Sequence, residues 1–505
     1  MNKIFKVRGH IPVMLLLTAA VFLCSCSLPG ALPTATPTPD RTATPALPSP
    51  TPTLSPTPTE TPVPEYLSVE PETLNGENIV LRYSLDGKVQ ETLTNLVSRF
   101  NEENTFGITV RAVPAYSLEA LASFISNEAS EQTDLVIAGS AWLRSQNSSG
   151  AFSGLSDFIN APELSFENRS VSPIMPVMLA EEDQDGEYFA LPLWAEPAFL
   201  FYNKTWAIEL GFEDTPTDLA GFAEQACAAG KASYSEKEQG KHGTGGWIIS
   251  SDPEDVMSWL LIFAQDDQTP GGILRSENGD VFSDTAAWLR NLYDNGCAWN
   301  SRVKEPYNYF ANRYALFYSG TYADAERQFN AFEQSSEYGF DNWDLIVYPG
   351  RSVGKNTDPR IYGNVVSAAL LNGEAGKMNA AWHFLRWLYE DQHAAELALA
   401  AGAWPVQDND AVTKMYRNSG EDKLYQTLSY RQYLVNNDAD GNWLTDQLIL
   451  SDGFAYIFNP SVKAEDIAGI WDQIGSSIAE VSAVSNTIEI DKAEATTAQG
   501  GNDEQ

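Results

Sequence analysis

The chain has 505 residues, with 68 acidic and 31 basic side chains and a formal net charge of −37. This excess of negative charge argues against nucleic acid or anionic lipid as a partner of the whole surface, because both are polyanions. About 400 residues have a globular composition, which is more than one hydrophobic core usually supports, so we expect two lobes.

The N-terminal residues predict export from the cytoplasm. Lys3, Lys6 and Arg8 precede the apolar run "IPVMLLLTAAVFL", which is too short to span a bilayer comfortably. A charged region followed by a short apolar region is typical of a secretory signal. We therefore predict that residues 1–25 form a signal peptide.

Cys24 and Cys26, in the stretch "LCSCS", allow three interpretations: a metal pair, a disulfide or a lipid attachment site. Cysteine pairs that bind metals usually have at least two residues between them and further ligands downstream, and this pair has neither. Leu23-Cys24-Ser25-Cys26 resembles the lipobox of bacterial lipoproteins, in which a small residue precedes the cysteine that is diacylated. The resemblance implies a lipid on Cys26 and an anchor on the outer face of the cytoplasmic membrane. The alternative is an ordinary secretory signal that is cleaved nearby.

Residues 26–65 form a Pro/Thr/Ser tract with scarcely any large apolar side chains. Such a segment cannot bury enough surface to offset its chain entropy, so we predict a disordered, extended linker. In polyproline geometry it would reach up to about 100 Å. Residues 483–505 are also polar, and we predict a disordered tail there.

The first part of the globular body predicts alternating strands and helices. Strand-like and helix-like patterns follow one another at residues 78–85, 89–103, 107–113, 118–125 and 133–140, with Ser117 as the cap of the second helix. This order implies a parallel sheet with right-handed crossovers. Because such sheets bind ligands at the carboxyl ends of their strands, we expect Tyr83 to Asp86 and Gly139 to Trp142 at that edge.

Cys227 and Cys297 are the two cysteines of the body. In an exported protein, an isolated pair favours a disulfide, and closing a loop of about 70 residues would contribute about 4 kcal/mol. The alternative is two separate buried thiols.

Several motifs, taken in order, resemble the extracellular solute-binding proteins of ABC importers, in the sugar-binding group that includes maltose-binding proteins. The motifs are "LVSRFNEEN", "TDLVIAGS", "GEYFALPLW", "FLFYNKTWAIELGF", "FANRYALFYSGTYA", "IYGNVVSAALL" and "GAWPV", which lie between about residue 78 and residue 406. Each motif alone is weakly specific, whereas their order and spacing are fairly specific. Receptors of this family also commonly have a lipobox and a linker before the binding body.

The resemblance implies an α/β fold of two lobes, with a ligand cleft between them and hinge strands near "WAEPAFLFYNK" and "DPRIYGNVV". Lobe 1 would comprise 66–195 with 359–406 returning to it, and lobe 2 would comprise 196–358 with part of 407–482. The implied function is to capture a sugar or oligosaccharide by hinge closure and to deliver it to an ABC permease. The receptor would be a monomer without a cofactor.

Two positions carry over from the maltose-binding relatives. Glu196 lies six residues before Tyr202 of the "YNK" motif, where relatives have a glutamate that binds sugar hydroxyls. An ionised carboxylate can accept hydrogen bonds from two hydroxyls. The alternative for Glu196 is an ion pair with Arg or Lys. Tyr322 follows "SGT", where relatives place a Trp that stacks on sugar, so the ring is kept but specificity for maltodextrins is in doubt.

Further ligand-binding candidates follow predicted strands or flank the predicted crossings: Ser140, Trp142, Trp194, Trp247, Tyr362 and Trp404. For each Trp in this group, a place in the core is an equally good interpretation. Four other tryptophans occupy helical stripes and are predicted to be packing residues: Trp259, Trp288, Trp382 and Trp387.

Other functions are less well supported. Only three histidines lie beyond the signal segment, and the motifs of nucleotide-binding loops and hydrolase elbows are absent. A secreted carbohydrate-active enzyme stays possible, because glycoside hydrolysis needs only two carboxylates. A receptor for a polyamine or another small polar solute is a second alternative. "NNDADGNWLTDQ" and "EEDQDGEY" resemble the start of calcium loops but lack the terminal Glu, so we predict turns and no metal site.

Overall fold

The fold is described by a computed structural model. It describes residues 67, 70–126, 132–147, 150–166, 181–182, 187–235, 239–264, 268–275, 280–301, 303, 305–351, 359–435 and 443–480. The predicted signal peptide, Cys26, the predicted linker and the predicted tail all lie outside these residues. The centres of the two acidic turns, at 183–186 and 436–442, lie outside them as well.

The N-terminal strands form the parallel sheet that the sequence predicts. β1 (Asn78–Tyr83) pairs in parallel with β2 (Thr109–Pro114) and with β3 (Leu135–Gly139). α1 (Gly87–Glu103) and α2 (Leu118–Ile125) form the crossovers, and Ser117 caps α2 by accepting a hydrogen bond from the amide of Ala120. These pairings confirm the predicted order of strands and helices.

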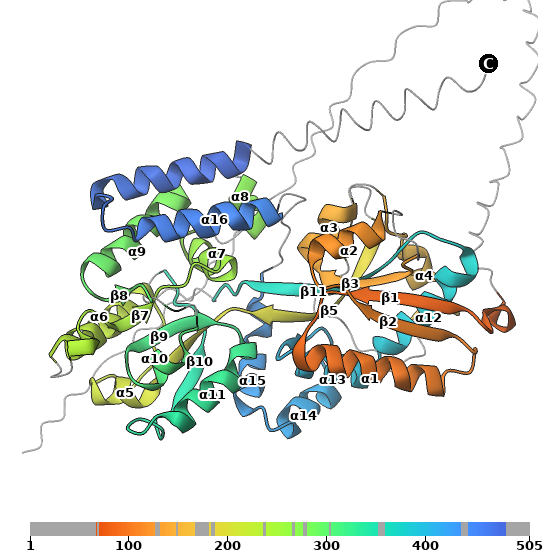
Figure 1. Cartoon of the computed structure of the whole chain (residues 1–505), viewed down its shortest axis with the longest axis horizontal. Coiled ribbons are helices and arrows are strands. Elements are labelled where there is room, and N and C mark those ends of the chain that lie inside the picture. Colours follow the sequence, from red (N-terminus) through yellow and green to blue (C-terminus); the bar gives the residue numbers. More distant parts are fainter. Residues whose placement is uncertain are drawn as a thin grey trace, which may run out of the picture. The chain divides into compact units, whose positions relative to one another are not determined.

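Four later strands complete this first sheet. They are β4 (Glu181–Glu182), β5 (Tyr188–Pro197), β11 (Gly363–Leu370) and β12 (Trp404–Pro405). The strand order is β12-β5-β11-β3-β1-β2, and β4 pairs with β5. β11 is antiparallel to both of its neighbours, β3 and β5. A strand from late in the chain therefore lies at the centre of the sheet (Figure 1).

The second sheet is built from the middle of the chain. Its strands are β6 (Phe199–Asn203), β7 (Gly245–Ile248), β8 (Ala298–Trp299), β9 (Ala315–Gly320) and β10 (Trp343–Ile346). Their order is β10-β6-β9-β7-β8, with β7 parallel to β8 and β9, and β6 antiparallel to β9 and β10. The molecule therefore has the two-sheet α/β architecture that the sequence predicts.

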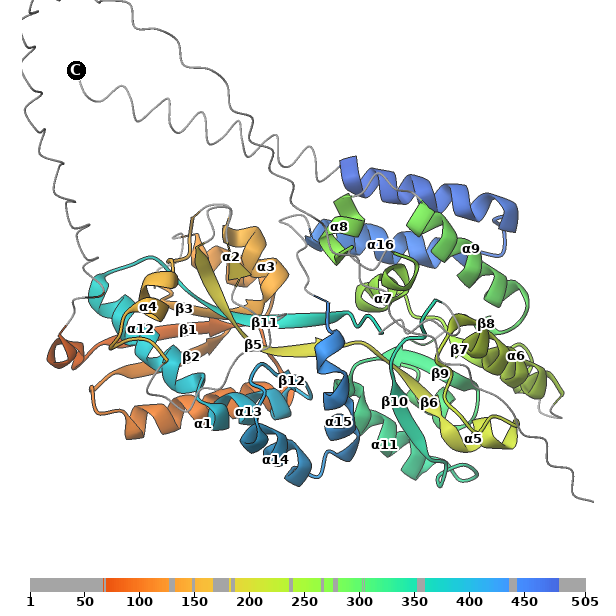
Figure 2. The same cartoon turned by 180° about the vertical axis from the view of Figure 1, so that it is seen from behind.

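The two sheets are joined where β5 passes into β6. β5 ends at Pro197 and β6 begins at Phe199, with Ala198 between them. The amide of Ala198 donates to the carbonyl of Tyr362 at 2.9 Å, just before β11 begins. The outgoing and returning passages are thus hydrogen-bonded to each other, and β5 and β11 lie side by side (Figures 1 and 2). The exact lobe boundaries stay a prediction.

Helices cover both sheets. Those between β3 and β11 are α3 (Ser140–Asn147), α4 (Ser156–Asn160), α5 (Lys204–Glu209), α6 (Leu219–Ser235), α7 (Pro253–Phe263), α8 (Pro270–Arg275), α9 (Asp280–Asp294), α10 (Tyr307–Ala311) and α11 (Ala325–Gln334). Those after β11 are α12 (Ala375–Leu388), α13 (Asp391–Ala400), α14 (Asp410–Asn418), α15 (Asp422–Thr427), α16 (Trp443–Ile457) and a last helix at 464–480. Short 3-10 helices are η2 (Pro71–Leu74), η4 (Gln239–Lys241), η5 (Tyr322–Asp324) and η6 (Leu428–Tyr433).

The C-terminal helices divide between two cores. α13 packs on α1, whereas α16 packs on α7 and α9. Trp382 belongs to the first core and Trp259 to the second, and Trp387 and Trp288 pack against these cores from the side. The prediction that these four tryptophans are packing residues is confirmed. None of the helices that the structure describes combines the length and hydropathy needed to cross a membrane.

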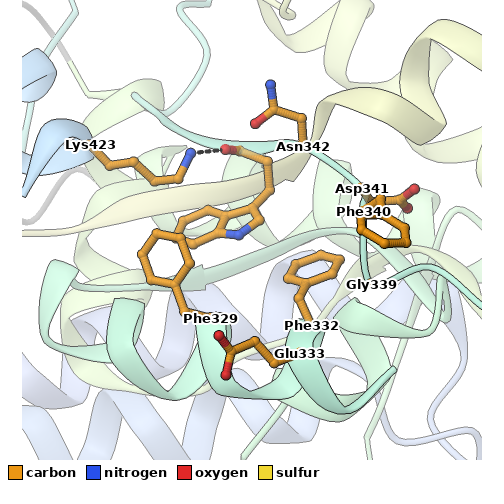
Figure 3. Close-up of a pocket in the computed structure, with 9 residues that line it drawn as sticks. Phe329, Phe332, Glu333, Gly339, Phe340, Asp341, Asn342 and Lys423 are labelled. Atoms are coloured by element: carbon orange, nitrogen blue, oxygen red, sulfur yellow. Dashed lines mark hydrogen bonds between the residues drawn. The ribbon is translucent and has the colours of Figure 1, made fainter. Parts of the chain in front are cut away.

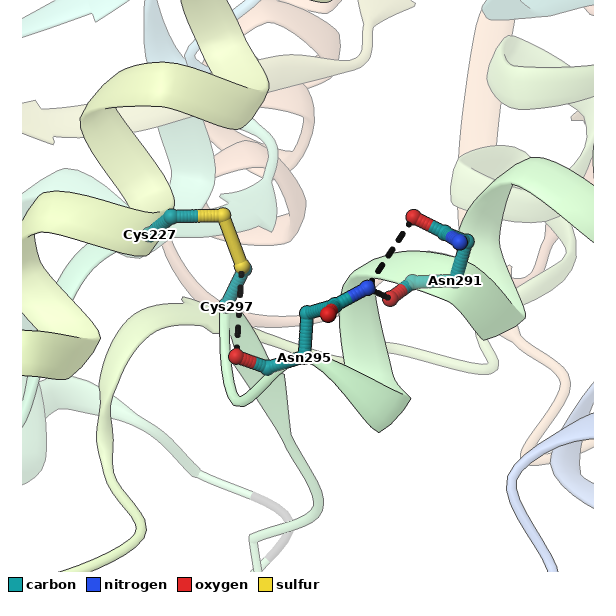
Figure 4. The surroundings of a disulfide bond; sticks show 4 residues. All are labelled: Cys227, Asn291, Asn295 and Cys297. Atoms are coloured by element: carbon teal, nitrogen blue, oxygen red, sulfur yellow. Dashed lines mark hydrogen bonds between the residues drawn. A yellow bond between two sulfur atoms is a disulfide. The ribbon is translucent and has the colours of Figure 1, made fainter.

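Cys227 of α6 and Cys297, which precedes β8, are joined by a disulfide (Figure 4). The bond closes a loop whose ends are 70 residues apart. β7 lies close to both α6 and the segment before β8: a Cβ atom on Gly246 would lie 2.6 Å from the carbonyl oxygen of Ala226 and 1.9 Å from that of Cys297. Only glycine fits at this position, because any side chain would overlap with backbone atoms.

Candidate functional site

The candidate site is centred on Glu196, near the end of β5. In the pairing of β5 with β11, Glu196 lies opposite Asn364. The indole Nε1 of Trp194 donates a hydrogen bond of 2.7 Å to Oε1 of Glu196, and the side chain of Asn364 also hydrogen-bonds to the carboxylate. Both partners are neutral. No ion pair of Glu196 with Arg or Lys is found among the residues that the structure describes, which disfavours the alternative of a structural ion pair.

Charged groups from both sides of the molecule act on Glu196. Burial raises its pKa most, the carboxylates of Glu254 and Asp86 raise it further, and the hydrogen bonds from Trp194 and Asn364 lower it. Asp86 immediately precedes α1 beside the first sheet, and Glu254 lies in the first turn of α7 beside the second. Glu196 is surrounded by protein but keeps part of its surface accessible to solvent. Glu196 is therefore a largely desolvated carboxylate that a solute from the water can still reach.

The first turn of α7 contributes two acids that our sequence prediction missed. Burial raises the pKa of Glu254, partly offset by a hydrogen bond from a backbone amide, and its side chain stays partly accessible. Asp255 is 3% exposed and accepts a 2.7 Å hydrogen bond from the hydroxyl of Tyr348. Burial raises the pKa of Asp255 to about 8. The sequence shows only two acids after Pro253 at a helix start, beyond the end of β7 at Ile248, and this pattern does not distinguish them from other acids.

Tyr362 is affected by charges on helices that pack beside both sheets. Its side chain is 1% exposed, and burial raises its pKa above the ordinary value. Glu254 raises this pKa further, whereas Arg144 of α3 lowers it. Tyr362 therefore lies within electrostatic reach of both α7 and α3. Glu254 acts on both Glu196 and Tyr362, whereas Asp86 acts on Glu196, and we refer to these four residues as the Glu196 group.

The predicted residues after β3 are buried at its carboxyl end. Oγ of Ser140 lies 2.6 Å from Oγ of Ser367 on β11, and Trp142 is 4% exposed. Ser140 thus forms a hydrogen bond within the first sheet's layer. Asn364 of β11 lies close by, because a Cβ atom on Gly139 would be 3.5 Å from its Oδ1. The structure brings the end of β3 next to the partner of Glu196.

The predicted tryptophans have internal partners in this conformation. Trp194, Trp247 and Trp404 are fully buried. The indole of Trp247 donates to Ser319 at 3.2 Å, and that of Trp404 donates to Thr427 at 2.9 Å. Trp194 donates to Glu196 and so supports the candidate site directly. A ligand contact by any of these rings stays a prediction.

Tyr322 lies in a second group of contacts between the two parts of the molecule. Its hydroxyl donates to Glu421, just before α15, and its ring packs on Gly402, where a Cβ atom would be 3.1 Å away. Close by, Lys88 of α1 forms a 2.6 Å ion pair with Glu326 of α11. Burial and the bond to Glu421 raise the pKa of Tyr322. The structure does not place Tyr322 in direct contact with Glu196, and a stacking role stays a prediction.

The Glu196 group can accept hydrogen bonds and can stabilise positive charge. Carboxylates, an amide and a phenol are present, as in sites that bind hydroxyl-rich or amine ligands. Among the described residues, no group of three or more His, Cys, Asp or Glu side chains is arranged to hold a metal ion. His383 contacts Phe106, and His393 contacts Trp387, so both belong to the helical layer near α1.

Comparison with known proteins gives a family for most of this body. Residues 95–421 match the family model described as "Bacterial extracellular solute-binding protein". No curated protein matches the chain by sequence.

Solved structures share the fold at low sequence identity. One is a cyclic alpha-maltosyl-1,6-maltose binding protein from Arthrobacter globiformis, at 14% identity and a TM-score of 0.62, covering 80% of this chain and 98% of that one. Another is the sugar-binding protein MalE from Xanthomonas citri, at 17% identity and a TM-score of 0.63, covering 81% and 99%. A third is an ABC transporter solute-binding protein from Agrobacterium radiobacter in complex with ribitol, at 17% identity and a TM-score of 0.55, covering 81% and 99%.

Proposed function

We propose, from the premise that this chain belongs to the bacterial extracellular solute-binding proteins, that it is the substrate-binding receptor of an ABC importer for a sugar or oligosaccharide. The observation that supports the proposal is the position of Glu196 and the absence of charge on its hydrogen-bond partners. Its carboxylate lies on the strand that leads from one sheet to the other, and its hydrogen-bond partners are neutral. It therefore keeps acceptor capacity for the hydroxyl groups of a ligand.

The ligand class is supported by proteins of the same fold. Those compared above are named for binding a cyclic maltosyl-maltose and sugar, and one was solved with ribitol. All of these ligands are rich in hydroxyl groups. A deep, partly accessible carboxylate beside an amide is suited to such ligands, because it accepts hydrogen bonds from adjacent hydroxyls.

The mechanism that we propose is closure about the β5–β6 and Tyr362–β11 passages. A ligand that contacts Asp86 on one side and Glu254 on the other is held by both sides only in the closed form. It would therefore shift the population toward that form. The Lys88–Glu326 pair joins α1 to α11 and would add to the closed form in the same way. The receptor itself would perform no catalysis.

We further propose that a lipid on Cys26 anchors the receptor to the outer face of the cytoplasmic membrane. Residues 26–65 would then serve as a linker that lets the body reach its permease. A monomer would suffice, because both halves of the site come from one chain.

A cationic solute such as a polyamine is the second candidate, and one observation favours it. The carboxylates of Glu254 and Asp86 both repel the negative charge of Glu196 and raise its pKa. A bound cation would relieve this repulsion. The two candidates differ in how strongly binding depends on charge.

The test is a thermal-shift screen of the body from Glu65 onward against monosaccharides, maltodextrins, other oligosaccharides, polyols and polyamines. A true ligand at one hundred times its dissociation constant stabilises the folded state by about 2.7 kcal/mol. A sugar or polyol hit, recovered unchanged after incubation, supports the proposed receptor. A hit confined to polyamines replaces the ligand class, and chemical conversion of the ligand would overturn the non-catalytic proposal.

A further inference from the structure

A recess lies on the side of the second sheet that carries α11, and none of the residues that line it belongs to the Glu196 group. It has a volume of about 480 Å³, in the range of small-molecule sites. Its walls come from the second half of α11 and from the segment that leads into β10, with Lys423 of α15 at one side (Figure 3). Four aromatic rings line it: Phe329, Phe332, Phe340 and Trp343.

These rings form a buried wall and an exposed rim. Phe332 and Trp343 are buried, whereas Phe329 is 45% exposed and Phe340 is fully exposed. The centroid of the Phe329 ring lies 4.9 Å from that of Trp343. Two large apolar side chains thus stay in contact with water beside a hollow, although burying them would be favourable.

The loop that presents Phe340 is firmly held. Asp341, the next residue, accepts two 2.7 Å hydrogen bonds from the guanidinium of Arg313, a bidentate ion pair with little exposure. Gly339 lets the loop approach α11, because a Cβ atom there would lie 2.9 Å from the carbonyl oxygen of Phe332. The backbone that carries the exposed ring is therefore held before any partner binds, which lowers the entropy cost of ordering this loop.

The charges around the recess are mostly neutralised within the protein. The ammonium of Lys423 lies over the ring of Trp343, donates to the carbonyl of Trp343 and pairs with Asp344 at 3.3 Å. Glu333 has an exposed carboxylate at the edge of the recess (Figure 3). It forms no ion pair or hydrogen bond with any residue that the structure describes. The recess therefore offers aromatic faces and a hydrogen-bond acceptor, without a free cation for an anionic ligand.

We propose that this recess is a second binding site, for a pyranose unit of a neutral oligo- or polysaccharide. The faces of Phe340 and Phe329 would cover the C–H face of the sugar ring, and Glu333 would accept from its hydroxyls. The site is separate from Glu196, so a long glycan can be held at the surface of the protein independently of the solute bound at the hinge.

The test is affinity electrophoresis in gels that contain soluble starch, xylan, β-glucan or galactomannan. All variants carry Glu196→Ala, so that the hinge site is disabled. We expect retardation by at least one polysaccharide, and Phe340→Ala or Phe329→Ala to weaken it by roughly tenfold. Phe340→Trp should retain it. Tyr234→Ala removes a ring on α6 that is 70% exposed, between the values of Phe329 and Phe340, and should change nothing.

Two results would overturn the proposal: no retardation of the parent protein by any of the four polysaccharides, or equal retardation of the parent and the Phe340→Ala variant. Loss of permease binding by Phe340→Ala, with no effect on polysaccharide binding, would mean that a protein partner occupies the surface. Melting temperatures of the variants confirm that they are folded. In proteins that retain Glu196, Phe340→Ala should leave the thermal shift caused by the ligand from the solute screen unchanged. A failure of the second-site proposal can therefore be distinguished from a failure of the receptor proposal.

Discussion

Trp194 and Glu196 point to the same face of β5, and the indole Nε1 of one donates to Oε1 of the other at 2.7 Å. Residues two apart on a strand share a face, so this contact is a direct result of the strand conformation. The bond fixes one carboxylate oxygen while part of the side chain stays accessible. The carboxylate is therefore oriented before a ligand arrives.

We expect Glu196→Gln to weaken binding of a neutral sugar by about tenfold, because the amide still accepts a hydrogen bond but without charge. A cationic ligand should lose more than about thirtyfold, because its partner charge is removed. Calorimetric titration of both proteins with the ligand found in the screen measures this. Glu102→Gln, an exposed acid on α1, is the matched control and should bind as the parent does. Unchanged affinity of Glu196→Gln would remove Glu196 from the site.

Asp255 should make stability fall as pH rises. Its pKa is raised by burial to about 8 in the folded protein, against 3.8 for the ordinary side chain. The folded state therefore holds a proton that the unfolded state releases, and the stabilisation is complete below pH 4 and is lost as pH rises to about 8. Asp255→Asn keeps an acceptor for Tyr348 and should raise the free energy of unfolding at pH 7 by at least about 1 kcal/mol.

Melting temperatures of the parent and of Asp255→Asn from pH 4 to pH 8 test this sign. The difference between the two proteins should grow as pH rises. Asp466→Asn, at an exposed position on the last helix, is the control, because this acid does not contribute to the pKa of Asp255. A constant difference across the range would contradict a raised pKa of Asp255.

The Cys227–Cys297 bond should contribute about 4 kcal/mol, because it closes a loop with a sequence separation of 70 residues. Reduction with dithiothreitol should lower the melting temperature of the parent protein. The double variant Cys227→Ser/Cys297→Ser should melt at the lower temperature with or without the reductant. Equal melting of the oxidised parent and the double variant would show that the bond does not stabilise the folded state.

Arg313→Ala should destabilise the protein by about 3–5 kcal/mol, because it leaves the carboxylate of Asp341 without its bidentate partner in a nearly inaccessible site. Arg313 also has a φ of +58°, a left-handed backbone conformation that residues other than glycine rarely adopt. Chemical denaturation measures the loss. Arg327→Ala on α11 removes an exposed guanidinium and should cost far less.

Much of the fold could be predicted because its signals are local. The stripe of Leu93, Leu96 and Phe100 and the alternation of Val110 with polar neighbours depend only on nearby residues, and all four side chains are buried as expected. The family resemblance, carried by short motifs in a fixed order, is confirmed by the match over residues 95–421.

The roles of the candidate site residues could not be predicted in this way, because they depend on contacts between segments that are distant in the sequence. The sequence offered Trp247 and Trp404 as equally good core or ligand residues, and only the partners Ser319 and Thr427 show where their indoles point. Glu254 was missed because nothing local distinguishes it from other acids. Its importance comes from its proximity to Glu196, about sixty residues earlier, through charge effects that exist only in the fold.

The central place of β11 fixes the order in which the two sheets can be completed during synthesis. Every strand of the second sheet lies between Phe199 and Ile346, so that sheet can form before the first one has all of its strands. The first sheet begins earlier in the chain, but β3 and β5 have an open gap between them until Gly363–Leu370 is available. A growing chain that ends near residue 350 would expose two unpaired strand edges, which are prone to pair with other chains. The half of the molecule that is made first is therefore the one that most needs protection until its last strands arrive.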